Sequence, residues 1–382
     1  MSQINIRNLS NENDDGSPEI VGVSTFSATS FFVPPKGSTA ERPSDCEPGS
    51  IRFNTDTANL EYFRGKTLGW SQFELINPNL GGGTGSNTGV GVRGLFAGGF
   101  ISPTGTARTN IIDFITISTL GNAQDFGDRT HVSDTCAGAA SKTRGVIAGG
   151  YAGSETNVIE FVTISSLGDA LDFGDLPSNR RNRDGCGDTV RGLFGGGYPF
   201  SAQIDYITFE SLGNAIDFGD LTQTRYNSGA LSSSTRAVFA GGNASPTSPN
   251  SNVIDFVTIR TTGNATDFGD LIGTMGTGGF SGTSNSTRGL IGIADSNSIE
   301  FITIATTGNA QDFGDATYNL GSHAAAGSPT RAVFAGGGAS PAPLTNSMDF
   351  VEILTTGNGL DFGDLTDGRQ SLAGFSNGHG GL

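Results

Sequence analysis

The tetrapeptide Asp-Phe-Gly-Asp occurs six times in this chain and strongly constrains its fold. Beside each copy lies an apolar segment that begins with an arginine and ends in small residues. The copies begin at Asp125, Asp172, Asp217, Asp267, Asp312 and Asp361, so the repeat is 45–50 residues long. The arginines are Arg93, Arg144, Arg191, Arg236, Arg288 and Arg331. A repeat of this length with strand-like content is typical of a β-propeller, in which each repeat forms one blade.

Composition agrees with a protein of many short strands. Sixty of the 382 residues are glycine, roughly twice the usual share of about 7 %. Short apolar runs alternate with segments rich in glycine, serine, threonine and asparagine, which indicates strands joined by tight turns. The net charge of −16 argues against a nucleic-acid partner, because an acidic surface repels phosphate groups.

Neither membrane insertion nor a disulfide framework is expected. No apolar run approaches the roughly 20 residues that a membrane-spanning helix needs. The polar N-terminal segment lacks the apolar core of a secretory signal. The three cysteines, Cys46, Cys136 and Cys186, lie at different phases of the repeat, so they predict no shared bridge or metal cluster.

One repeat contains four strand-sized segments. Between residues 226 and 270 they are SGALSSS, the arginine-led AVFAGG, the longer NVIDFVTIRTTG, and NATDFGDL. Four antiparallel strands would make one blade, with Asp-Phe-Gly-Asp at the end of the outer strand. There we expect the phenylalanine to anchor the blade, the glycine to permit a turn, and the aspartates to accept hydrogen bonds from backbone amides. The Gly-Gly pair that ends AVFAGG suits positive φ angles.

The two ends of the repeat region are expected to meet. No small-residue strand precedes Arg93, but the chain supplies one after the last repeat, SLAGFSNG at residues 371–378. We expect this strand to complete the first blade and so remove an open sheet edge.

The order of segments resembles the kelch repeat family. AVFAGG at 237–242 and DFGDLTQTR at 217–225 carry the resemblance. Phenylalanine stands where kelch repeats usually have tryptophan, at Phe126, Phe173, Phe218, Phe268, Phe313 and Phe362. The expected fold class is therefore all-β, a six-bladed kelch-like β-propeller over residues 92–382 closed by the C-terminal strand and preceded by a small module containing a β-hairpin.

The first 91 residues divide into three parts. Residues 1–30 are a polar arm, residues 31–76 a small β module, and residues 77–91 a flexible glycine-rich linker. In the module, SIRFN and NLEYF predict a hairpin. The module resembles one found in bacteriophage tail-fibre and structural proteins, especially those of phages of marine cyanobacteria. The matching residues are Gly37, Thr39, Ala40, Arg42, Pro43, Gly49, Ile51, Arg52, Phe53, Asn54, Asp56, Thr57, Glu61, Tyr62 and Trp70.

No catalytic residue, metal site or cofactor is predicted. Asp-Phe-Gly also binds magnesium in protein kinases, but here it recurs without the other kinase motifs. Asp-x-x-Asp supplies fewer oxygens than the six or more that calcium requires, so a structural role is the simpler interpretation. The three histidines, His131, His323 and His379, are interpreted as surface residues. A non-enzymatic protein is expected.

The loops offer the best candidates for binding. The turns between the first and second strands, and between the third and fourth, are short and nearly constant, whereas the loops of the opposite face vary. Variable loops on a rigid scaffold suit recognition. The predicted binding residues on this face are Phe100, Tyr151, Tyr198, Phe200, Arg181 and Arg183. A structural role is expected instead for the arginines that share one phase of the repeat, Arg180, Arg225 and Arg369.

The two resemblances together imply a phage virion structural protein. It would be a tail fibre, appendage or capsid-surface protein that displays the propeller on the particle and contacts the host surface or a glycan. Residues 1–76 would bind other virion proteins, in many copies, with homo-oligomerisation left open. The alternatives are a propeller-fold polysaccharide hydrolase and a cellular kelch-type interaction adaptor.

Overall fold

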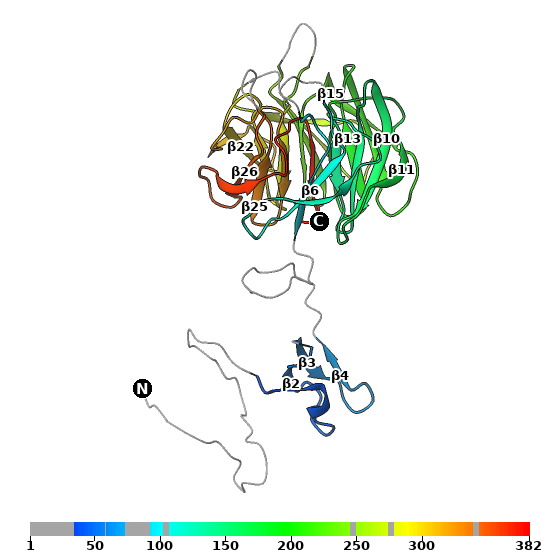
Figure 1. The fold of residues 1–382 in the computed structure, drawn as a ribbon, viewed down its shortest axis with the longest axis vertical. Coiled ribbons are helices and arrows are strands. Elements are labelled where there is room, and N and C mark those ends of the chain that lie inside the picture. The colour runs from blue at the N-terminus through cyan, green and yellow to red at the C-terminus, as the bar shows by residue number, and fades with distance from the viewer. Residues whose placement is uncertain are drawn as a thin grey trace. The chain divides into compact units, whose positions relative to one another are not determined.

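The computed structural model describes residues 34–57, 59–72, 92–101, 107–244, 250–273, 279–338 and 344–382. The chain forms two compact units, Met1–Asn77 and Pro78–Leu382 (Figure 1). The predicted arm of residues 1–30 and linker of residues 77–91 lie outside the described residues.

The smaller unit contains one four-stranded sheet. Its strands are β1 (Lys36–Gly37), β2 (Ile51–Asn54), β3 (Asn59–Phe63) and β4 (Trp70–Gln72), with a 3-10 turn at Thr39–Glu41. They lie in the order β1-β2-β3-β4. Strands β2 and β3 pair antiparallel, which confirms the predicted hairpin, and β1 pairs parallel to β2.

Polar side chains occupy much of the interior of this sheet. Arg52, Asn54 and Glu61 are buried, and Glu61 is hydrogen-bonded by Arg42 and by the Asn54 amide. The ion pair with Arg42 lowers the pKa of Glu61. Among the described residues of this unit, Phe63 is the only buried large apolar side chain. A unit with so small an apolar core gains little stability from burial of its own.

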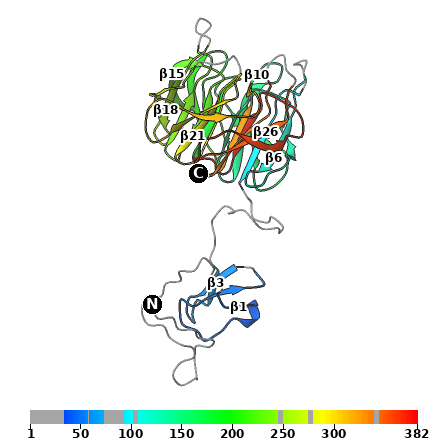
Figure 2. The ribbon, with the colours of Figure 1, turned by 90° about the vertical axis from the view of Figure 1, so that its left-hand side faces the viewer.

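The larger unit contains six four-stranded antiparallel sheets, which confirms the all-β prediction (Figure 2). We number the sheets 1 to 6 along the chain. Sheet 1 is β28-β5-β6-β7, sheet 2 is β8-β9-β10-β11, and sheets 3 to 6 are β12–β15, β16–β19, β20–β23 and β24–β27. In each sheet the first-named strand is the inner strand and the last-named is the outer strand.

Each class of sequence segment occupies the same place in every sheet. The small-residue segments form the inner strands, β28 (Ala373–Ser376), β8 (Ala137–Ala140), β12 (Asp184–Gly187), β16 (Gly229–Ser232), β20 (Ser281–Ser284) and β24 (Ala324–Gly327). The arginine-led segments form β5 (Arg93–Ala97), β9 (Arg144–Tyr151), β13 (Arg191–Gly195), β17 (Arg236–Ala240), β21 (Arg288–Gly292) and β25 (Arg331–Ala335).

The longer segments and the Asp-Phe-Gly-Asp segments follow in the same way. The third strands are β6 (Ile111–Thr116), β10 (Glu155–Thr163), β14 (Ser201–Thr208), β18 (Val253–Thr258), β22 (Ser298–Thr303) and β26 (Ser347–Glu352). The outer strands are β7 (Gln124–Asp128), β11 (Leu171–Asp175), β15 (Ile216–Arg225), β19 (Thr266–Asp270), β23 (Gln311–Asp315) and β27 (Leu360–Asp364).

The C-terminal strand pairs with the first strand of the repeat region. Ala373 lies opposite Ala97 and Ser376 opposite Gly94 in the antiparallel register of β28 and β5. This pairing confirms that SLAGFSNG completes the sheet begun by Arg93.

The backbone and the phenylalanine of Asp-Phe-Gly-Asp make its structural contacts. Each phenylalanine is buried and meets an aromatic side chain of the neighbouring strand edge-on, at 5.9–6.1 Å between ring centroids. Each glycine has a φ between 140° and 147° beside a bulge in the strand pairing. The expected role of the aspartate side chains is not observed: no described hydrogen bond ends on them, and the last aspartate instead donates its backbone N–H.

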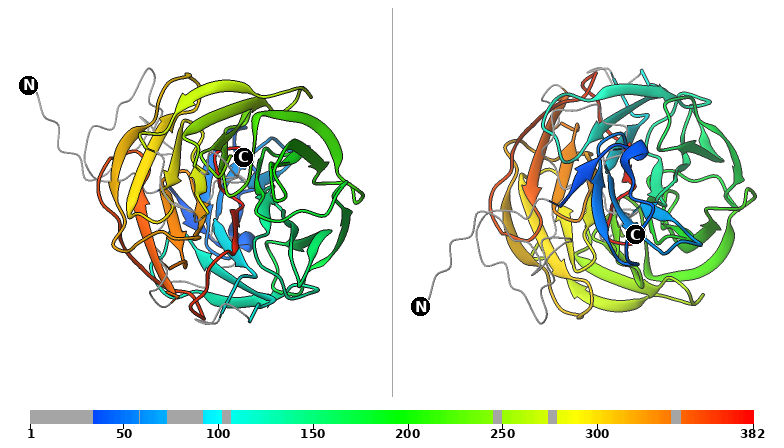
Figure 3. Two further views of the ribbon diagram at one scale, coloured as in Figure 1. Left: turned by 90° about the horizontal axis from the view of Figure 1, so that it is seen from above. Right: turned by 90° about the horizontal axis from the view of Figure 1, so that it is seen from below.

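These N–H groups link the six sheets in cyclic order. Each bonds at 3.0–3.1 Å to an asparagine or aspartate in a turn of the next sheet, namely Asp169, Asn214, Asn264, Asn309, Asn358 and, from Asp364 of sheet 6 back to sheet 1, Asn122. Six apolar clusters fill the six sheet-to-sheet interfaces, including the interface of sheet 6 with sheet 1. The arrangement is propeller-like (Figure 3).

The leading arginines repeat one further inter-sheet contact. Each stacks on an aromatic ring of its own sheet at 4.5–4.9 Å. Each also donates to a backbone carbonyl of the next sheet at 2.6–3.2 Å, from Arg93 to Ile164 through to Arg331 to Ser118. The arginine in the motif is therefore structural.

The third strand of each of the six sheets also carries one buried carboxylate. They are Asp113, Glu160, Asp205, Asp255, Glu300 and Asp349. In sheets 1 to 4 these side chains form ion pairs at 2.7–3.2 Å with Arg369, Arg129, Arg183 and Arg225 respectively. Among the described residues, Glu300 and Asp349 have no arginine partner.

Candidate functional site

Glycine pairs place a set of side chains at one end of the propeller-like arrangement of sheets. Gly98-Gly99, Gly149-Gly150 and Gly196-Gly197 all have positive φ, as predicted. A side chain on Gly150 would come within 2.7 Å of the Asp134 carbonyl, so the close approach requires glycine.

The residue after each glycine pair is held beside the segment that leads to an inner strand. Phe100, Tyr151 and Tyr198 form isolated bridges with Gln370, Asp134 and Arg181 respectively. We call this end of the ring the mouth.

Aromatic and arginine side chains alternate along part of the mouth. Arg108 lies 5.0 Å from the Phe100 ring and 4.6 Å from the Tyr151 ring. Arg181 lies 4.6 Å from Tyr151 on its other side and 4.7 Å from Tyr198. The stack crosses sheets 1, 2 and 3, and we call it the arc.

Three aromatic rings end the arc. Tyr198 lies 5.6 Å from Tyr226 and 6.5 Å from Phe200, and Phe200 lies 5.0 Å from Tyr226, all between ring centroids. Tyr198 is the most exposed ring, at 36 %. Tyr151 has an arginine on both sides, so Tyr198 and its neighbours provide the more accessible aromatic surface.

Each arginine of the arc has an acidic neighbour. Arg108 lies 3.3 Å from Asp134, and Arg181 lies 3.5 Å from Glu155. Burial raises the pKa of Asp134, an effect that Arg108 partly opposes. The arc therefore combines aromatic surface and guanidinium groups without a large net charge.

The structure brings together five of the six predicted binding residues: Phe100, Tyr151, Tyr198, Phe200 and Arg181. The prediction for Arg183 is wrong. Its side chain is 1 % exposed, and it donates to Asp205 at 2.7 Å and to the Phe194 carbonyl at 2.6 Å.

The grouping of Arg180 with Arg225 and Arg369 also needs correction. Arg225 and Arg369 are buried in ion pairs, as a structural role requires. Arg180 is only half-buried and bonds to Ser178 and Gln203, so in sheet 3 Arg183 takes the equivalent structural place. The backbone keeps its phase, because the Arg180 carbonyl accepts from Gly150 as the Arg225 and Arg369 carbonyls accept from Gly197 and Gly337. Only the side-chain role passes to Arg183, which position counting could not reveal.

Sequence reasoning missed Arg108 and Tyr226. Tyr226 lies at the same position in its repeat as Arg181, so counting from the inner strands could have identified it. Arg108 lies in a variable loop and has no equivalent that could have signalled its place.

A channel opens beside the arc, between the inner strands. Residues that precede these strands form a chain of backbone hydrogen bonds from sheet to sheet: Ser371 N–H to the Ser322 carbonyl, Thr135 to Ser371, Asn182 to Thr135, and Asn227 to Asn182, at 2.8–3.0 Å. These residues also have positive φ, near 55–60°. In sheet 5 the Gly279 N–H faces the Ser322 hydroxyl at 3.4 Å.

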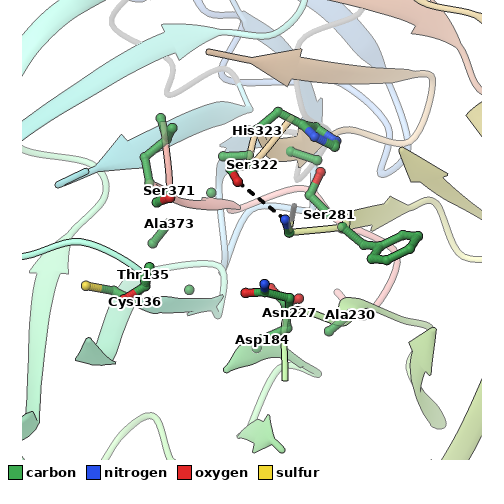
Figure 4. Close-up of a pocket in the computed structure, with 18 of the residues that line it drawn as sticks. Thr135, Cys136, Asp184, Asn227, Ala230, Ser281, Ser322, His323, Ser371 and Ala373 are labelled. Atoms are coloured by element: carbon green, nitrogen blue, oxygen red, sulfur yellow. Dashed lines mark hydrogen bonds between the residues drawn. The ribbon is translucent and has the colours of Figure 1, made fainter. Parts of the chain in front are cut away.

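The channel is a cavity of about 70 Å³ lined by polar groups of the mouth and small residues of the inner strands. Figure 4 shows Thr135, Asn227, Ser322 and Ser371 around its open centre, with Asp184 below Asn227. Arg181 and Tyr226 of the arc directly precede Asn182 and Asn227, which line the cavity. The arc and the channel are thus parts of one surface.

His323 and Cys136, which also line the channel, each have a hydrogen-bond partner, although the Nε2 of His323 has none among the described residues. His323 is buried, its Nδ1 lies 2.7 Å from the Leu320 carbonyl, and burial lowers its pKa to about 4. Arg129 donates to the Cys136 sulfur at 2.8 Å. The expectation of surface histidines is therefore wrong for His323, whereas His379 is half-buried and bonds to the Ala140 carbonyl at 2.8 Å.

Within the described ranges, no three His, Cys, Asp or Glu side chains are placed to hold a metal ion. None of the described segments forms a helix long and apolar enough to cross a bilayer. No protein-family model and no curated protein matches this sequence.

Proposed function

We propose that residues 92–382 form a closed six-bladed kelch-like β-propeller and that the chain is a structural protein of a phage virion. The cyclic hydrogen bonds and apolar interfaces of the six sheets support the closed ring. The resemblance of the hairpin module to phage tail-fibre and structural proteins supports the virion. Residues 1–76 would attach the chain to other virion proteins, and the propeller would lie on the surface of the particle.

The mouth would contact a glycan of the host surface without cleaving it. The observation that carries this step is the arc, which gathers five aromatic rings and two arginines beside a polar channel. Aromatic rings offer apolar surface with polar edges, and guanidinium groups offer hydrogen-bond donors. Many copies on one particle would add their weak contacts through avidity.

Binding of the purified full-length protein to host cells and to extracted host polysaccharide tests this function. Tyr198→Ala should weaken binding by at least about tenfold, because exposed aromatic rings commonly dominate binding surfaces. Leu212→Ala is the matched control, since Leu212 is 58 % exposed in the turn between β14 and β15, at the end of the sheet opposite the mouth. Equal binding by the two variants would contradict the proposal.

The same samples separate the alternatives. Release of reducing sugars from the polysaccharide would favour the hydrolase. Capture of a soluble cellular protein in place of polysaccharide would favour the adaptor. Imaging of an intact particle would test the virion assignment directly.

A further inference from the structure

The end of the channel opposite the mouth is covered by residues 378–382. The His379 ring bonds to the Ala140 carbonyl of sheet 2 at 2.8 Å. Gly380 packs against the backbone of Asn285 and Ser232, and Gly381 against Gly187, so closely that a side chain on either glycine would overlap those carbonyls. Both views in Figure 3 place this end of the chain near the centre of the ring. A ligand can therefore enter the channel only from the mouth.

Asp184 is the exceptional residue of the channel lining. It is the first residue of its inner strand, and the equivalent residues in the other sheets are Ala137, Gly229, Ser281, Ala324 and Ala373. It is half-buried and lines the cavity. Among the described contacts, none supplies a hydrogen bond or a cation to its carboxylate. Burial without a compensating charge raises its pKa well above the usual range.

An unpaired carboxyl in a partly enclosed site costs stability unless water or a ligand satisfies it. The cavity of about 70 Å³ has room for several water molecules, each needing roughly 10–15 Å³. A single carboxylate falls far short of the six or more oxygens of a calcium site. Hydroxyl groups fit better, because two carboxylate oxygens can accept from two neighbouring O–H donors. The amides and hydroxyls of Asn182, Thr135 and Ser371 add both donors and acceptors.

We propose that this channel receives the end of a glycan, with the vicinal hydroxyls of the non-reducing terminal ring donating to the Asp184 carboxyl. Because the far end is covered, a polysaccharide cannot thread through, and only the edge of a terminal ring enters. The arc then contacts the rings that follow. This inference rests on the proposed glycan binding and adds which part of the glycan is recognised.

Methyl glycosides of (1→3)-linked tetrasaccharides of glucose, galactose and mannose provide the test. Only their non-reducing ring carries vicinal hydroxyls, so periodate oxidation followed by reduction alters that ring alone. Affinities are measured by calorimetry with full-length protein. We expect at least one intact tetrasaccharide to bind and its oxidised form to bind at least about tenfold more weakly, the scale of one hydrogen bond to a charged group.

Asp184→Asn should weaken binding of the intact tetrasaccharide by a similar factor and leave binding of the oxidised form unchanged. Asp172→Asn is the control, because it makes the same substitution at an exposed position of an outer strand. Asp184 has no partner to lose and its buried charge is penalised, so the thermal midpoint of the variant should equal or exceed that of the wild type. The inference is overturned if no intact tetrasaccharide binds, if oxidation has no effect, or if Asp184→Asn binds like the wild type.

Failure of the proposed function looks different. In that case the wild-type protein would bind neither host cells nor their polysaccharide. If the wild type and Asp184→Asn bound host polysaccharide equally well, the proposed function would be retained and only the recognition of the glycan end would be rejected.

Discussion

At the scale of single residues, the buried carboxylates of the third strands differ in how far their charge is compensated. Asp255 accepts from Arg225 at 2.9 Å and from the Thr222 hydroxyl at 2.6 Å. Glu300, at the same place in sheet 5, accepts a single described hydrogen bond, from the Ile272 N–H at 3.0 Å. Burial accordingly raises the pKa of Glu300. The same position is therefore a compensated charge in one sheet and an uncompensated one in another.

Replacing Glu300 with glutamine should raise the free energy of unfolding at neutral pH. The amide oxygen can still accept from Ile272, and the cost of the buried charge disappears. Because the folded protein holds the Glu300 proton more tightly than the unfolded chain, the wild type loses stability as pH rises from the ordinary glutamate pKa through the raised one. The gain should therefore grow across that window and vanish below it, as urea denaturation at a series of pH values would measure.

Asp255→Asn is the matched comparison and should act in the opposite direction. It leaves the fully buried Arg225 without its counter-charge, a loss that typically costs about 3–5 kcal/mol. If both amide variants destabilised the protein alike at neutral pH, the distinction between the two kinds of site would be refuted.

At the scale of elements, the sequence predicts the four strands of each repeat but not how neighbouring repeats touch. Small, arginine-led, longer and Asp-Phe-Gly-Asp segments each form the expected strand. The sequence predicts the anchoring role of the phenylalanine in Asp-Phe-Gly-Asp, but not the contacts of its glycine and of its last N–H. Both of these groups contact a turn of the next sheet. Gly269, for example, lies against Gly308, and the Asp270 N–H bonds to Asn309. Such partners are about 40 residues away, beyond what a local pattern encodes.

Two glycine variants should isolate this contact between sheets. Gly269 and Gly308 have similar φ angles, 146° and 155°, so alanine strains the backbone at both, by about 1–3 kcal/mol. A Cβ on Gly269 would lie 2.5 Å from the Gly308 carbonyl oxygen, whereas a Cβ on Gly308 would meet nothing within 4 Å. Gly269→Ala should therefore cost a further 1–3 kcal/mol or so, measured by chemical denaturation. Equal losses would mean that the sheets separate freely at this point.

At the scale of the whole molecule, predictability differs between the scaffold and the candidate site. The pairing of β28 with β5 follows from counting segments, since one strand is missing at the start and one is left over at the end. The arc and channel do not follow in that way, because they depend on what differs between repeats. Variable loops pointed to Tyr151 and Tyr198, but burial of Arg183 and the isolation of Asp184 are properties of the assembled sheets.

The proposed closure of the ring predicts that its last strand is as firmly held as an internal one. Phe375 in β28 fills the space above Gly145 of sheet 2, just as Leu231 in β16 fills the space above Gly289 of sheet 5. Both are buried, at 5 % and 2 % exposure. Phe375→Ala should cost about 3–5 kcal/mol and Leu231→Ala about 2–5 kcal/mol, in a single cooperative denaturation transition for each variant. If β28 were a loosely attached end, Phe375→Ala would change the unfolding free energy little while Leu231→Ala still reduced it, and the closed ring would have to be abandoned.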